Sequence, residues 1–74
     1  MSENVVRLDL RQTCCRLAQE IGWYLRFSGA SRIEALVARG AAPVLEEVRL
    51  TVSGWLLTVA PEGDDLLAVY QRKA

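Results

Sequence analysis

The 74-residue sequence contains no histidine, only one lysine and only two cysteines. Without histidine it lacks the commonest acid/base residue near neutral pH, and with it the usual catalytic triads and most zinc sites. Cys14 and Cys15 are consecutive, so their Cα atoms are about 3.8 Å apart, below the usual disulfide range of about 4.4–6.8 Å. We therefore expect a protein that is not an enzyme, holds no metal or cofactor, and has no disulfide framework.

An excess of charge and a long hydrophobic run are also missing. Nine basic and nine acidic side chains cancel, so no overall field draws the chain towards nucleic acid or an anionic membrane. The longest apolar stretch without charge, Leu50–Ala60, is much shorter than the roughly 20 residues that span a bilayer as a helix. Residues 1–4 lack the basic start and apolar core of a secretory signal. We expect a cytoplasmic protein with no membrane partner.

A high apolar content in a short chain is what the sequence does have. The hydrophobic fraction of 51% is typical of folded chains, and the length allows one domain, residues 1–74. Such a domain buries only about 60% of its unfolded surface, and its core supplies about 3–5 kcal/mol. Because disulfides and metals are excluded, association between copies is the remaining source of stability, and we expect a homo-oligomer.

The first helical pattern lies in residues 10–27. Apolar residues recur there at spacings of three and four, which places them on one helix face. Asp9 and Gln12 resemble a capping box at its start, and the glycine after Ser28 favours an end near Phe27. The preceding segment, Val5–Leu8, fits either a short strand or an extra helical turn.

A second helix is predicted after Ser31. Ser31-Arg32-Ile33-Glu34 is a full capping box, and Gly40 is a natural C-cap. Pro43 is then expected to keep the chain from becoming helical again at once. The apolar side of this helix is made by Ile33, Leu36 and Val37.

From Val48 the hydrophobic period changes from about 3.6 residues to 2. A two-residue turn at Ser53-Gly54 would place the apolar residues of both arms on one face of a hairpin. The expected pairs are Val52 with Trp55, Leu50 with Leu57, and Val48 with Val59.

A second turn at 61–64 leads to a third strand, Leu66–Arg72, with Leu67 and Val69 on the core face. The predicted fold class is α+β, with two helices packed on a three-stranded antiparallel meander in the order α-α-β-β-β. The other sheet face would be too apolar for a solvated surface, so a neighbouring chain or part of the helical layer must cover it. That face would collect Leu56, Ala60, Leu66, Ala68 and Tyr70.

The two cysteines allow different interpretations. Cys14 falls on the apolar stripe of the first helix and is interpreted as a small core residue. Cys15 points away from the stripe, near Arg11 and Arg26, and arginine can lower the pKa of a thiol. A reactive Cys15 in a redox protein and a partly exposed thiol without function both fit the pattern.

Leu17-Ala18-Gln19-Glu20-Ile21-Gly22 resembles the first half of a helix-turn-helix of the winged type, in which an alanine and a glycine lie four residues apart. The resemblance implies a small DNA-binding regulator whose reading helix would be Arg32–Arg39. It covers six residues, and the segment after Gly22 continues the helix where that family turns. Nucleic acid is thus the alternative partner.

An interaction surface is the main functional hypothesis. Trp23 and Phe27 lie off the main apolar stripe of the first helix, on the side of Arg16. Either the second helix covers them, or they form an aromatic and arginine patch of the composition found in interface hot spots. We predict a non-catalytic protein–protein interaction domain that binds copies of itself and a further protein, as a small regulatory or scaffolding protein. The predicted partner-binding residues are Arg16, Trp23, Phe27, Leu56 and Tyr70.

Overall fold

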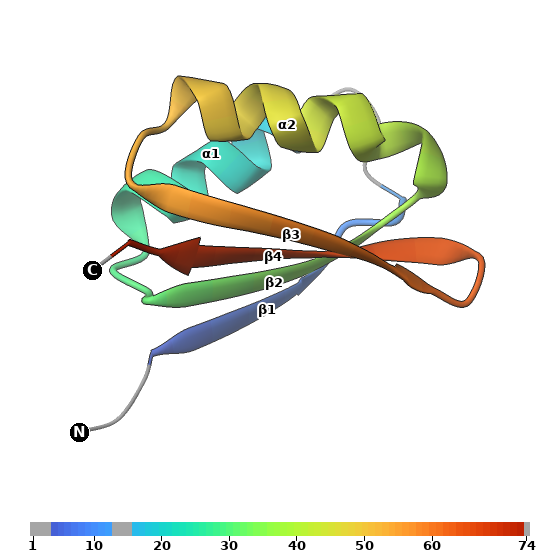
Figure 1. Cartoon of the computed structure of the whole chain (residues 1–74), viewed down its shortest axis with the longest axis horizontal. Helices are drawn as coiled ribbons and strands as arrows, with labels where there is room; N and C mark the ends of the chain where they lie inside the picture. The colour runs from blue at the N-terminus through green and yellow to red at the C-terminus, as the bar shows by residue number, and fades with distance from the viewer. Residues whose placement is uncertain (1–3, 13–15, 74) are drawn as a thin grey trace.

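The structure of the chain, a computed structural model, describes residues 4–12 and 16–73. Within these residues the elements follow the order β1-α1-β2-η1-α2-β3-β4, where η1 is a single turn of 3-10 helix (Figure 1). Their bounds are β1 Val5–Asp9, α1 Leu17–Phe27, β2 Arg32–Val37, η1 Arg39–Ala41, α2 Ala42–Thr51, β3 Trp55–Glu62 and β4 Asp65–Arg72.

The four strands form one mixed sheet in the order β1-β2-β4-β3. β1 runs parallel to β2, and α1 forms the crossover between them, whereas β4 is antiparallel to both of its neighbours. Both helices lie on the same side of the sheet (Figure 1). The described residues therefore form two layers, and neither of their α-helices lies on the second face of the sheet.

The core lies between the helices and the sheet. α1 contributes Leu17, Ile21 and Leu25, which recur every four residues and are all buried. β2 contributes every second residue, because side chains of a strand alternate between its faces. The other buried residues are Ala30, Ile33, Ala35, Val37, Leu45, Val48, Trp55, Ala68 and Tyr70.

The α+β class with two helices is confirmed, but the predicted three-stranded antiparallel meander is wrong. The segment predicted as the second helix is instead β2, a strand between β1 and β4. The two polar side chains of the supposed capping box make other bonds. The Ser31 hydroxyl donates to the Asn4 carbonyl at 3.3 Å, and the Glu34 carboxylate pairs with Arg7 and Arg32.

The predicted hairpin between residues 48 and 59 is also wrong, because its first arm is the end of α2. Leu45, Val48 and Val52 pack on the core at helical spacing, while Leu50 is 72% exposed. Pro43 lies in the first turn of α2, where its missing N–H breaks no helical bond. The expectation that Pro43 keeps the chain from becoming helical is therefore wrong, because Pro43 lies in the first turn of a helix that begins at Ala42.

The third predicted strand is confirmed as β4, but its faces are reversed. β3 and β4 are joined by the two-residue turn Gly63-Asp64, so that Glu62 pairs with Asp65 and Leu57 with Tyr70. Residues opposite each other in antiparallel strands share a face. Ala68 and Tyr70 thus lie in the core beside Leu57, whereas Leu67 and Val69 belong to the open face.

The N-terminal segment settles one alternative and corrects another expectation. Val5–Asp9 is a strand, so the extra helical turn is excluded. Asp9 ends this strand and caps no helix; its carboxylate accepts bonds from Arg11 Nε at 2.9 Å and Nη2 at 2.7 Å. The first helix ends at Phe27 as predicted, yet it begins at Leu17. Cys14 and Cys15, with their predicted roles, lie outside the described residues.

Candidate interaction surfaces

The open face of the sheet has an apolar centre. Leu36 of β2 pairs with Leu67 of β4, and Val69 lies two residues further along β4 on the same face. Leu56 adds an exposed apolar side chain at the start of β3. Both helices lie on the other side of the sheet (Figure 1), so no helix of the described residues covers these side chains.

Ion pairs surround this apolar centre on the side of β1. Arg7 Nε lies 3.1 Å from Glu34, and Arg32 Nε lies 2.8 Å from the same carboxylate. Arg11 bridges Asp9 and Asp65, at 2.7 and 3.5 Å. The hydrogen bonds from Arg11 hold the pKa of the Asp9 carboxyl below its usual value. The β1 edge of the sheet is therefore charged, in contrast to its centre.

Trp23, Tyr24 and Phe27 form a second apolar surface, on α1, which we call the aromatic patch. Trp23 is 54% exposed and Phe27 is 67% exposed. The Trp23 ring stands edge-on to Tyr24 at 5.2 Å between centroids and lies 5.9 Å from Phe27. The element that was expected to cover these residues is β2, which belongs to the sheet. The patch remains in contact with solvent.

The predicted partner-binding residues lie in three separate places. Arg16, Trp23 and Phe27 lie along one side of α1, from its N-cap at Arg16 to its last residue, Phe27. Arg16 also lines a surface depression with Trp23. Leu56 is 54% exposed on the open sheet face. Tyr70, by contrast, is fully buried, and its hydroxyl donates to the Leu45 carbonyl at 2.8 Å. Its predicted place on an outer surface is wrong.

An arginine stacks on a tryptophan ring where β4 meets β3. The Arg72 guanidinium lies 4.3 Å from the centroid of the buried Trp55 ring. The same group donates to the Ala30 carbonyl from Nη2 at 3.0 Å. Arg26 lies over Gly22, where an added Cβ would come within 2.8 Å of Nη1. Gly22 thus leaves room for this guanidinium in the groove between α1 and α2.

The outer edge of β3 is the surface that the sequence analysis missed. β3 is the last strand of the sheet on its side. It carries no charged residue from Trp55 to Pro61, and Leu56 and Val59 are exposed. The uncharged stretch Leu50–Ala60 is visible in the sequence. The predicted hairpin, however, places residues 48–52 along the edge of residues 55–59 that is free in the structure.

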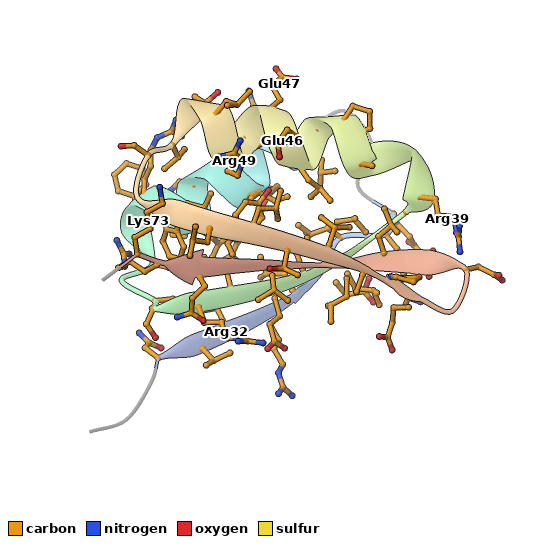
Figure 2. All side chains as sticks on the ribbon, in the orientation of Figure 1. Arg32, Arg39, Glu46, Glu47, Arg49 and Lys73 are labelled. Carbon is orange, nitrogen blue, oxygen red and sulfur yellow. The ribbon has the colours of Figure 1, made fainter. Side chains whose placement is uncertain are left out.

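Glu46 and Arg49 of α2 lie above this edge. Figure 2 shows both side chains on the side of α2 that faces β3, whereas Glu47 points away from the sheet. Arg49 Nε donates to the Glu46 carboxylate at 3.0 Å, and this bond lowers the pKa of Glu46. The two residues also act on the pKa of the buried Tyr70 in opposite directions. α2 therefore presents a negative and a positive group next to the β3 edge.

Other kinds of site find little support in residues 4–12 and 16–73. No helix among them is long and apolar enough to cross a bilayer. They contain no group of three or more potential ligand side chains placed to hold a metal ion. The helix that would read DNA is β2, so the resemblance to a winged helix-turn-helix does not extend to the fold. Comparison of the chain with protein-family models, curated proteins and solved structures gives no significant match.

Proposed function

We propose that this chain is a non-catalytic protein–protein interaction domain that associates with itself and binds a further protein as a small regulatory or scaffolding subunit. The observation that carries the proposal is the aromatic patch, in which Trp23 and Phe27 are more than half exposed and in contact with each other. Tryptophan is enriched in interface hot spots, and clustered exposed apolar side chains mark interaction sites.

The chemistry around the patch also favours a protein partner. Arg16 and Glu20 line the depression next to Trp23, so the aromatic centre has a polar rim, as is typical of interfaces that form and dissociate. The Trp23 and Phe27 rings lose little conformational freedom on binding because each has only two side-chain torsions. A partner with an apolar groove flanked by an acidic group for Arg16 and a basic group for Glu20 would match this surface.

Affinity capture with three baits tests the binding of a further protein. The wild type, the double variant Trp23→Ala/Phe27→Ala and the control Leu50→Ala are used on extracts of the source cells. Leu50 is a matched control because it is 72% exposed on the other helix. We expect one protein to be retained by the wild type and by Leu50→Ala and lost from the double variant. Equal retention by all three baits would contradict the proposal.

Sedimentation equilibrium tests the self-association. The proposal predicts an average mass above that of one 8.2 kDa chain at micromolar concentration, falling towards it on dilution. A single species of one-chain mass up to several hundred micromolar would refute self-association and leave only the binding of a further protein.

A further inference from the structure

The free edge of β3 has a defined set of unpaired backbone groups. Lys73 N–H donates to the Gly54 carbonyl at 2.9 Å, so Gly54 belongs to a hydrogen-bonded pair. Such pairs alternate along antiparallel strands, and Leu56, Thr58 and Ala60 therefore also bond to β4. The N–H and C=O groups of the intervening residues point to the free edge. These residues are Trp55, Leu57 and Val59, followed by Pro61, which has no N–H to offer.

The chain protects its other sheet edge but not this one. Natural edge strands usually carry charges, bulges or prolines that prevent pairing with another chain. β1 is short and carries Arg7 and Asp9. β3 has its only proline at position 61, so three consecutive outward positions remain free to pair. In residues 4–12 and 16–73, no backbone hydrogen bond outside the sheet uses the groups of Trp55, Leu57 or Val59.

We infer that β3 pairs antiparallel with β3 of a second copy of this chain, about a two-fold axis at Leu57, to form a continuous eight-stranded sheet. This inference rests on the proposed self-association and names the surface that carries it. In this register Leu57 faces Leu57 of the second copy, and Trp55 faces Val59. Each hydrogen-bonded pair exchanges two bonds, so three pairs supply about six. A two-fold arrangement is closed and does not grow into a fibre.

The charges of α2 are complementary in this arrangement. Tyr70 pairs with Leu57 across the sheet, and its hydroxyl donates to the Leu45 carbonyl of α2 at 2.8 Å, so the middle of α2 lies close to Leu57. The two-fold axis then passes between Glu46 and Arg49. It brings α2 of each copy side by side on the same sheet face and places each Glu46 opposite Arg49 of the other copy. This pairing of opposite charges follows from the two-fold axis, so a second copy of the chain supplies it, whereas a strand from an unrelated protein would not.

The first test removes one outward N–H group. Val59→Pro deletes a donor that β4 does not use, since proline is tolerated at the outward positions of an edge strand. Val59→Ala is the matched control, because it loses side-chain atoms but keeps the N–H. By sedimentation equilibrium we expect Val59→Pro to raise the dimer Kd by about tenfold or more, whereas Val59→Ala stays within about threefold of the wild type. Far-UV circular dichroism checks that both variants are folded.

The second test uses the charges and does not depend on proline. Glu46→Arg and Arg49→Glu each place like charges opposite each other, so each variant alone should dimerise more weakly. A 1:1 mixture should restore the dimer, because the heterodimer has opposite charges at both positions. Glu47→Arg is the control: its side chain points away from the sheet (Figure 2), and its dimer should be unchanged.

The outcomes separate this inference from the proposed function. A wild type that is monomeric at all concentrations overturns both the self-association and its β3 surface. A wild-type dimer that is insensitive to Val59→Pro, with no recovery in the mixture of charge variants, shows self-association through another surface and overturns the β3 pairing alone. Recovery in the mixture, together with loss in Val59→Pro, supports the pairing.

Discussion

Replacing Tyr70 by phenylalanine isolates one buried hydrogen bond in this small core. The Tyr70 side chain is fully buried, and its hydroxyl donates to the Leu45 carbonyl of α2 at 2.8 Å. Leu45 lies inside α2, so its carbonyl also accepts the N–H four residues later. The substitution therefore leaves a satisfied acceptor and no cavity as large as a residue. We expect the free energy of unfolding to fall by about 0.5–1.5 kcal/mol, the net value of one such bond.

The assay is urea denaturation at pH 7, followed by circular dichroism. With an m value of about 1 kcal/mol/M for a small domain, the midpoint should fall by about 0.5–1.5 M. Tyr24→Phe, on the half-buried aromatic side of α1, is the matched control and should change the midpoint little. A Tyr70→Phe variant as stable as the wild type would show that the hydrogen bond does not stabilise the fold. A loss above about 3 kcal/mol would instead indicate a core that has rearranged.

The difference in unfolding free energy between the wild type and Tyr70→Phe should depend on pH. Burial raises the pKa of Tyr70 above its ordinary value. The stabilisation linked to this shift is complete below the unfolded pKa of about 10 and is lost as the pH rises towards the folded pKa. The advantage of the wild type over Tyr70→Phe should therefore shrink between pH 9 and 11, because only the wild type must keep a buried phenol protonated. An unchanged difference at pH 11 would refute this reasoning.

Three further substitutions test local contacts by the same denaturation assay. Gly22→Ala should stabilise the domain by up to about 1 kcal/mol, because α1 gains helix propensity while the flexible Arg26 side chain can move from the added Cβ; a destabilised variant would show that Arg26 is held in place. Arg72→Ala should cost about 1.5–3 kcal/mol, since it removes the bonds to the Ala30 carbonyl. Gly63→Ala should cost about 1–2 kcal/mol, because Gly63 has φ +62° in the β3–β4 turn; unchanged midpoints would contradict either expectation.

Local pattern was sufficient for elements whose neighbours in space are also neighbours in sequence. The end of α1 at Phe27 follows from the serine and glycine after it, and Gly29 does adopt a positive φ of 73°. β4 was found from its position after a turn and its alternating residues. The two-residue turn itself, with glycine at its first position, is of a kind that joins antiparallel strands directly.

β2 was missed because two local signals conflicted and tertiary pairing decided between them. Ser31 and Glu34 have helix-capping spacing. The buried residues Ile33, Ala35 and Val37, however, alternate with less buried residues at the strand period of two. A strand between β1 and β4 forms backbone bonds on both sides. Those partners lie more than 20 residues away in the sequence, so no short window contains the information that selects the strand.

The candidate surfaces were predictable only in part. The aromatic patch follows from the helical phase of α1, because Trp23 and Phe27 are four residues apart and off the buried stripe. The β3 edge was not predictable, because it depends on which strand comes last in the sheet. The order of the strands depends on β2, which lies between β1 and β4, and the β2 segment is the one predicted to be a helix. The alternation of Trp55, Leu57 and Val59 predicts a strand, but it does not tell which edge of that strand pairs with β4 and which edge stays free.

The core face of β4 was predicted to carry Leu67 and Val69, but it carries Ala68 and Tyr70. This reversal shows why hydrophobicity alone cannot identify the interior of so small a domain. The two residues that meet at the centre of the sheet under the helices are Ala35 and Ala68, both fully buried. Small side chains there let the helical layer approach the sheet, and the larger Leu36 and Leu67 are left for the open face. A ranking by hydrophobicity places the leucines inside, whereas the space available beneath the helices selects the alanines. The resulting domain keeps some of its most apolar side chains outside its own core, which is the condition under which association with another chain gains the most apolar burial.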